Sequence, residues 1–143
     1  MKKILLVLAV FMAVAVIAQK SIAPDVVKAA FTKAYPGATK VKWEKEDGNF
    51  EVTFVQNGNE ISAIYNPKGI LQEAEHEMKA TELPATVLAY MKDYYKGIKV
   101  KGGAKITKAD GTVNYEAAIK GKDVIFDANG KFIKESKEAK EKD

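Results

Sequence analysis

The sequence predicts an α+β protein in which a unit of one helix and four strands occurs twice, so that an antiparallel sheet of about eight strands carries two helices on one face. One observation behind this prediction is a repeat: residues 21–37 align with residues 81–97, and residues 65–69 align with residues 126–130. The other is that the apolar spacing in each copy changes once, from helical to alternating. A single unit buries too little apolar surface to stand alone, so the two units are expected to share one core.

Residues 1–18 have the pattern of a secretory signal peptide. Lys2 and Lys3 form a basic head, and residues 4–18 are an uncharged apolar run. The run ends in Val16-Ile17-Ala18, which has small residues at the two positions that signal peptidase recognises. A membrane span needs about 20 apolar residues, and this run is shorter. We therefore expect an exported, soluble mature chain, with a retained span as the alternative. Since no cysteine follows the run, we expect no lipid attachment through cysteine.

The predicted domain plan places a signal peptide at 1–18 and a single domain at 19–135, made of two repeats at 22–79 and 82–135. Residues 136–143 are rich in charge and are expected to form a flexible tail.

The helices are predicted from prolines and apolar spacing. The first begins at Pro24, whose missing N–H needs no partner in a first turn, and runs for about 12 residues to Pro36-Gly37. The second begins at Pro84 and ends at Lys96-Gly97. The predicted buried stripes are Val27, Ala30, Phe31, Ala34 and Tyr35 in the first helix, and Val87, Leu88, Met91, Tyr94 and Tyr95 in the second. Adjacent helix positions point about 100° apart, so one of the last two tyrosines should be partly exposed.

Alternating segments separated by turn residues predict the strands. In the first copy they are 39–46, 50–56, 61–65 and 70–78, and in the second 99–108, 113–119, 123–126 and 131–134. Asp47-Gly48 and Asn57-Gly58 are typical of tight hairpin turns. The aromatic residues expected in the core under the helices are Trp43, Phe50, Phe54, Tyr65, Tyr115 and Phe126.

Composition argues against several classes of partner. Loss of Lys2 and Lys3 lowers the formal charge from +4 to +2, and all 23 basic residues are lysine. The planar, bidentate capture of phosphate that arginine provides is therefore absent, and nucleic-acid binding is disfavoured. With no cysteine, the chain forms no disulfide and no zinc–thiolate site. We predict no cofactor and no membrane span after signal cleavage.

At this point the sequence resembles the tandem PepSY-like family of small exported proteins, which is also described as beta-lactamase-inhibitor-like. The matching segments are the helix that ends in "YPGA", the "VKWEKEDGNFEVTF" hairpin and the "DANGKF" turn. The resemblance covers about residues 23–135. It implies a duplicated α+β fold with a curved sheet in the Gram-negative periplasm, with exchange of helices between halves as an open alternative, and it implies no established reaction.

The second copy departs from this pattern. It has no tryptophan at the place of Trp43, and its first strand contains Gly102-Gly103. Glycines inside a strand indicate a bulge or the close approach of another group.

His76, the only histidine, lies among Glu73, Glu75 and Glu77, which raises the question of a metal site. Neighbouring strand residues point to opposite faces, so the histidine is expected to share its side with Ala74 and Met78, away from the glutamates. We therefore predict no metal site here. The segment 127–130 is expected to be a plain turn rather than a calcium loop, because the remaining ligands are missing. No serine lies in a nucleophile context.

The face of the sheet away from the helices is the candidate binding surface. We expect a mixed polar surface with two aliphatic members, which is either simply solvated or docks a protein or peptide. Its expected residues are Lys40, Lys42, Glu44, Glu51, Thr53, Val55, Glu60, Ser62 and Ile64.

Three functions follow as hypotheses. The favoured one is a non-catalytic periplasmic binding module that docks, or inhibits, a protein partner of the envelope on this face. A small-ligand or metal carrier is the alternative and predicts a pocket between the halves. An enzyme, which we disfavour, predicts a cleft lined by acids with perturbed pKa values. The sequence leaves the partner and the oligomeric state open.

Overall fold

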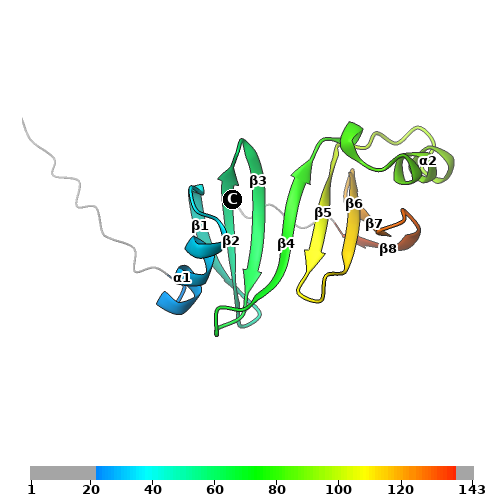
Figure 1. The fold of residues 1–143 in the computed structure, drawn as a ribbon. Coiled ribbons are helices and arrows are strands. Elements are labelled where there is room, and N and C mark those ends of the chain that lie inside the picture. Colours follow the sequence, from blue (N-terminus) through cyan, green and yellow to red (C-terminus); the bar gives the residue numbers. More distant parts are fainter. Residues whose placement is uncertain (1–21, 138–143) are drawn as a thin grey trace, which may run out of the picture.

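In the computed structural model, residues 22–137 form one eight-stranded antiparallel sheet with two α-helices. The strands lie in chain order from β1 to β8, and the helices lie near opposite ends of the sheet (Figure 1). The elements are α1 (Asp25–Ala34), β1 (Thr39–Glu46), β2 (Asn49–Gln56), β3 (Asn59–Tyr65), β4 (Leu71–Met78), the 3₁₀ turn η1 (Ala80–Glu82), α2 (Ala85–Tyr94), β5 (Gly102–Lys108), β6 (Val113–Ile119), β7 (Lys122–Asp127) and β8 (Phe132–Lys137). The predicted α+β class and strand number are confirmed.

Several element bounds differ from the prediction. Each helix has 10 residues instead of about 12, and β5 begins at Gly102 instead of residue 99. Strand β8 continues to Lys137, two residues into the predicted tail. The predicted signal peptide at 1–18 and residues 138–143 lie outside the described residues.

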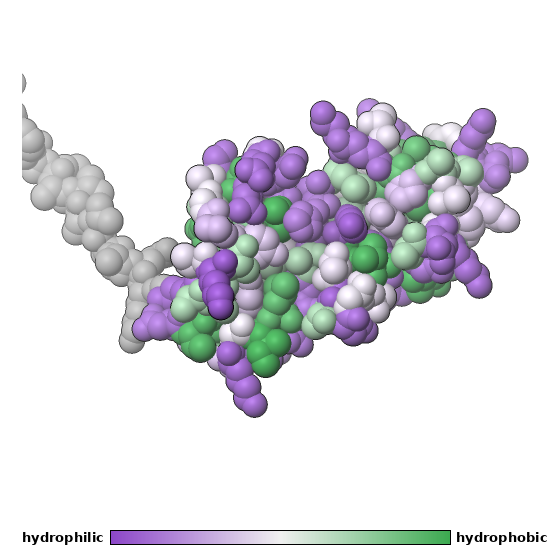
Figure 2. Space-filling view, viewed as in Figure 1, coloured by the Kyte–Doolittle hydropathy of each residue, from purple (hydrophilic) through white to green (hydrophobic). Residues whose placement is uncertain are grey.

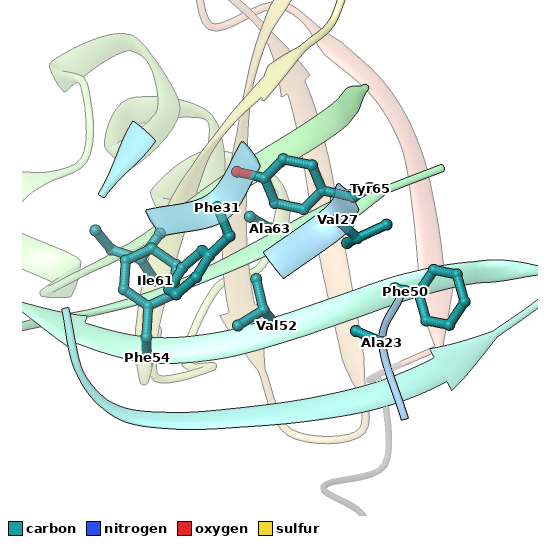
Figure 3. Packing of buried hydrophobic residues seen from close by; sticks show 9 residues of the cluster. All are labelled: Ala23, Val27, Phe31, Phe50, Val52, Phe54, Ile61, Ala63 and Tyr65. Atoms are coloured by element: carbon teal, nitrogen blue, oxygen red, sulfur yellow. The ribbon is translucent and has the colours of Figure 1, made fainter. Parts of the chain in front are cut away.

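Helix α1 packs its Val27 and Phe31 onto β1–β3. The Phe31 ring meets Phe54 edge-on at 5.0 Å between centroids (Figure 3). It also meets Trp43 edge-on, at 5.4 Å. Ala34, predicted to lie in the buried stripe, is exposed because the helix ends there and the chain turns away. The remaining stripe residues pack against the first core as predicted.

Helix α2 buries Val87 and Met91 over β6–β8. Tyr90, which the predicted stripe omitted, packs its ring against Phe126 at 5.3 Å and stacks on Phe132 at 5.4 Å. Tyr94, predicted to be in the stripe, is 72% exposed and stacks only on Tyr90. The expectation that one of the adjacent tyrosines is exposed is therefore confirmed, and the exposed one is Tyr94.

Both helices cover the same face of the sheet, as predicted. Directly paired residues on neighbouring strands point to the same face, so the register can be followed across the sheet. Ala63 under α1 pairs with Ala74, which pairs with Thr107 on β5. Gly103 shares the side of Thr107 on that strand and pairs with Ala117 under α2. Each helix packs on the strands that follow it in the chain, so the helices are not exchanged between the halves.

The expected single shared core is wrong. Buried apolar residues form two clusters, one under each helix. The reason lies at the middle of the β4–β5 seam, whose helix-facing side carries polar or small residues: the exposed His76 pairs with the exposed Lys105, and Ala74 pairs with Thr107. Met78, at the end of β4, packs against the second cluster. No large apolar side chain of this seam therefore bridges the clusters, and the continuous sheet joins them.

Gly103 has a clear packing role. A Cβ at this position would lie 2.7 Å from Leu83 Cδ2 and would also clash with the backbone carbonyl of Glu116. Under the 60-residue offset, Gly103 stands where Trp43 stands in the first half, and Leu83 stands where Ala23 stands. Large and small residues have thus changed places, which accounts for the missing tryptophan and agrees with the close approach predicted from the glycines.

Candidate docking face

The residues predicted for the candidate surface lie together on the side of the sheet away from the helices, with one exception. Lys42, Thr53 and Ser62 are successive register partners across β1–β3, as are Glu44, Glu51 and Ile64, and Val55 pairs with Glu60. We call this helix-free side of the sheet the open face.

Lys40 is the exception. A bulge in β1 breaks the pairing between Thr39 and Lys42, and Lys40 has a positive φ of 53°. Thr39 therefore takes the position opposite Val55, and the alternation that would place Lys40 beside Lys42 is interrupted.

The open face continues into the second half of the sheet. The register carries it onto β4–β7 at alternating positions. Its residues there are Glu73, Glu75, Glu77, Gly102, Ala104, Ile106, Lys108, Asn114, Glu116, Ala118, Asp123, Ile125 and Asp127. The sequence-based list stopped at β3 and missed this acidic part, although Glu116 aligns with Glu51 in the repeat.

Four of these open-face residues are buried: Ala104, Ile106, Asp123 and Ile125. None of the described helices covers them. The neighbouring side chains of the twisted sheet itself shield them, and Figure 1 shows the strands turning progressively across the sheet. The middle of the open face is thus sheltered from water even though it faces outward.

This sheltered position raises the pKa of several acids on the open face. Burial first, and then the charges of Glu77, Glu73, Glu51 and Asp123, raise the pKa of Glu75 to about 7. Burial, the charge of Glu75 and a hydrogen bond with Asp123 are among the causes that raise the pKa of Glu116 to about 8. The pKa of Glu77 is also raised, mainly by burial and by Glu60. At neutral pH Glu75 is therefore partly protonated and Glu116 largely protonated, whereas an ordinary glutamate would have lost its proton.

The structure separates His76 from the glutamates, as predicted. Its register partners Ile61 and Lys105 lie on the helix side, and burial together with Lys105 lowers the pKa of His76. Within residues 22–137, no group of three or more acidic or histidine side chains is arranged to hold a metal ion.

Residues 127–130 form a turn in which the Asp127 side chain accepts hydrogen bonds from backbone amides. Asp127 Oδ1 accepts hydrogen bonds from the amides of Asn129 and Lys131, each at 2.9 Å, and Asn66 makes the corresponding bonds to Lys68 and Ile70. The turn predicted for residues 127–130 is confirmed.

A hollow of about 300 Å³ lies on the helix side, between α1 and β1. Its lining includes the rings of Phe31, Tyr35 and Trp43, together with the exposed Val41. It is a feature of the first half alone and does not open between the halves, where the carrier hypothesis predicted a pocket.

Figure 2 shows hydrophilic side chains over much of the visible surface, with hydrophobic residues in separate patches between them. The most exposed large apolar residues are Tyr94, Ile22, Ile70 and Val26. No helix within residues 22–137 has the length and apolar character needed to cross a membrane.

Neither the protein-family models nor the curated proteins contain a match to this chain. Among solved structures, a BLIP-like protein of Bacteroides fragilis matches with a TM-score of 0.71 and 21% identity over 87% of this chain and 93% of its own. A DUF2874 family protein of Bacteroides uniformis matches with a TM-score of 0.73 and 19% identity over 80% and 89%. A proposed periplasmic protein of Bacteroides eggerthii matches with a TM-score of 0.76 and 18% identity over 82% and 90%.

At such identities the likeness shows the fold alone. The chain has a BLIP-like α+β fold, an open antiparallel sheet with two helices. The beta-lactamase-inhibitor-like part of the predicted resemblance is thus supported for the fold, whereas no comparison supports its PepSY-like and tandem parts.

Proposed function

We propose that this protein is a non-catalytic binding module of the periplasm that docks a protein partner on the open face. The observation that carries the proposal is the placement of both helices on one side of an eight-stranded sheet, which leaves the other side broad and uncovered by them. Docking on a wide face needs a few central anchors that lose contact with water. The half-buried Val55 and Ile64 have that character.

The compartment is part of the proposal. The apolar run at residues 4–18 has a signal-peptide pattern, and one matched structure is described as a proposed periplasmic protein. The helix-plus-four-strand order, which occurs twice along the chain, supports the proposal that the two halves arose by duplication. Inhibition of a hydrolase is one form that docking could take, in keeping with the BLIP-like fold.

Quantitative capture from a periplasmic extract tests the proposal. The tagged protein is compared with Val55→Asp and Ile64→Asp, which place a charge on the open face. Val26→Asp makes the same change at an exposed site on α1 and serves as the matched control. We expect the open-face variants to lose about tenfold of the captured partner and the control to retain it. Equal capture by all four proteins would show that the open face is not the docking site.

The raised pKa values of Glu75 and Glu116 are also a feature that the enzyme hypothesis predicted. An enzyme needs in addition a concave site that encloses its substrate. The hollow at α1 and β1 lies on the other side of the sheet from these acids. We therefore retain binding as the function and propose no reaction.

The same hollow favours a small-ligand carrier as the second candidate. Trp43, the only tryptophan, lines it and reports its occupancy through fluorescence. Binding to the native state must raise the melting temperature. Calcium, zinc and the apolar anion 1-anilinonaphthalene-8-sulfonate are suitable probes. A probe that changes Trp43 emission and raises the melting temperature would favour the carrier, and failure of all three would remove this support.

A further inference from the structure

The middle of the open face concentrates acids between aliphatic neighbours. Glu75 has Ser62 and Ile106 as register partners, and Glu116 has Ala104 and Ile125. Glu77 pairs with Ala104. None of these three central glutamates has a lysine directly across a strand, although lysine is the commonest charged residue of the chain.

Every strand of the sheet contributes to the electrostatic surroundings of this centre. The charged residues at open-face positions are Lys42, Glu44 and Glu46 on β1, Glu51 on β2, Glu60 on β3, Glu73, Glu75 and Glu77 on β4, Lys108 on β5, Glu116 on β6, Asp123 and Asp127 on β7 and Lys134 on β8. The lysines lie at the margin: Lys42 on the edge strand holds Glu44 at 3.0 Å, Lys108 ends β5 opposite Glu73, and Lys134 belongs to the other edge strand. Acids therefore dominate the centre.

Without a partner, the carboxylates of this centre repel one another. Half-buried carboxylates repel one another more strongly than exposed ones, because low dielectric surroundings screen charge poorly. Burial first, and then the repulsion among these acids, raise the pKa of Glu75 to about 7 and that of Glu116 to about 8, so that in the free protein bound protons relieve the conflict. A positive charge brought in by a partner would relieve it in the same way.

The aliphatic neighbours indicate what kind of cation fits. Ile64, Ile106 and Ile125 alternate with the acids across the face. Lysine and arginine side chains lay their methylene stems on apolar surface while the charged head reaches an acid. A metal ion fits less well, because no group of three or more metal-binding side chains is arranged for one within residues 22–137.

We propose that the open face takes a lysine- or arginine-bearing segment of a protein partner, and that this segment displaces protons from the central acids, so that docking strengthens as the pH rises. This inference rests on the proposed function and adds the chemistry of the partner and its regulation by pH. Before docking, Glu75 and Glu116 carry the protons that the partner displaces. After docking, Ile106 and Ile125 contact the methylene stems of the partner's lysine or arginine side chains.

A defined cationic probe tests the inference. A synthetic peptide of repeating Lys-Thr-Lys-Ile is titrated into the full mature chain by calorimetry near pH 6 and near pH 8.5, in two buffers that differ in ionisation enthalpy. The heat difference between buffers counts the protons released. We expect affinity about tenfold tighter at the higher pH, and release of about one proton near pH 7. A peptide with glutamate in place of lysine should not bind.

The decisive variant is Glu75→Gln with Glu116→Gln, which removes two titrating groups from the centre. The matched control is Asp47→Asn with Asp93→Asn, which changes the total charge equally at an exposed hairpin tip and on the exposed side of α2. Circular dichroism verifies that both double variants are folded. We expect the first to lose the pH dependence and proton release, and the control to keep both.

Two results would overturn the inference, and they separate it from the proposed function. Equal affinity at both pH values with no proton release would refute the coupling. Absence of peptide binding, or binding by the Glu75/Glu116 variant as tight as that of the parent protein at both pH values, would refute the cationic partner. The proposed function is judged separately by capture with Val55→Asp and Ile64→Asp, in which a charge at an aliphatic anchor opposes docking because that charge must be desolvated.

Discussion

The protein alone should lose stability as the pH rises from 6 to 9. Glu75 and Glu116 have pKa values of about 7 and about 8 in the folded chain against an ordinary 4.5. A raised carboxyl pKa means that the native state binds more protons than the unfolded state, so the stability falls until the pH has passed the folded pKa. Each pH unit per group is worth about 1.4 kcal/mol.

The magnitude follows from the pH interval that each group crosses. Between pH 6 and its folded pKa, Glu116 contributes about two units and Glu75 about one, which gives at most about 4 kcal/mol. The two acids interact and are partly exposed, so we expect a loss of about 3 kcal/mol. The groups with lowered pKa, Asp25, Asp110 and Glu135, are already ionised at pH 6 and do not add to this interval. The lowered pKa of His76 acts in the opposite direction, but only below its ordinary value of 6.5.

Urea unfolding followed by circular dichroism measures this loss. For a domain of this size about 3 kcal/mol corresponds to a fall in midpoint on the order of 2 M. In Glu75→Gln with Glu116→Gln the midpoint should change little over the same interval, whereas Asp47→Asn with Asp93→Asn should behave as the parent protein. A parent midpoint that stays constant or rises from pH 6 to 9 would refute the reasoning, as would an unchanged pH dependence in the glutamine variant.

Three further substitutions probe the packing. Tyr65 is buried and its hydroxyl has no hydrogen-bond partner among the described residues, so Tyr65→Phe should raise the free energy of unfolding by about 1 kcal/mol in urea titrations. Gly103→Ala should lower it by about 2 kcal/mol because the new methyl group meets Leu83 and the Glu116 carbonyl, whereas Gly102→Ala, with only one ordinary contact at 3.5 Å, should be nearly neutral; equal effects would contradict the packing. Phe126→Ala removes a fully buried ring and should cost about 4 kcal/mol by the same measurement, and a cost below about 1 kcal/mol would show that the second core is not packed as described.

Local sequence signals predicted most of the elements. Asp47-Gly48 and Asn57-Gly58 take positive φ at both residues, which suits the tight turns of twisted hairpins, and the flanking strands were placed correctly for that reason. Val113–Ile119 was predicted with its observed bounds because its alternation is uninterrupted. Ends that depend on tertiary contacts were predicted less well, as β8 shows by pairing with β7 up to Lys137.

The candidate face was predicted only in its first half. Alternation places Glu51 and Thr53 correctly, but a bulge depends on how two strands meet, and nothing in the local sequence marked Lys40 as part of one. The acidic centre was missed because it arises between β4, β6 and β7, which are brought together by strand order. Alternation around Glu116, between Tyr115 and Ala117, was the signal that could have placed it.

The helices show a similar limit. The three- and four-residue spacing identified Val87 and Met91 but not which way the aromatic residues turn. Tyr90 is held by Phe126 and Phe132, and these rings come from strands that the helix sequence does not contain. The burial of Tyr90 instead of Tyr94 is therefore a property of the assembled fold.

The polar seam between β4 and β5 divides the molecule mechanically. Six register pairs connect these strands, while the two hydrophobic clusters on either side of the seam remain separate. Coupling between the unfolding of the two halves therefore relies on the backbone hydrogen bonds between β4 and β5. Trp43, the sole tryptophan, packs in the cluster under α1, so its fluorescence reports the unfolding of that half alone. A time lag between the change in fluorescence and the change in ellipticity would measure how quickly unfolding spreads from one half to the other.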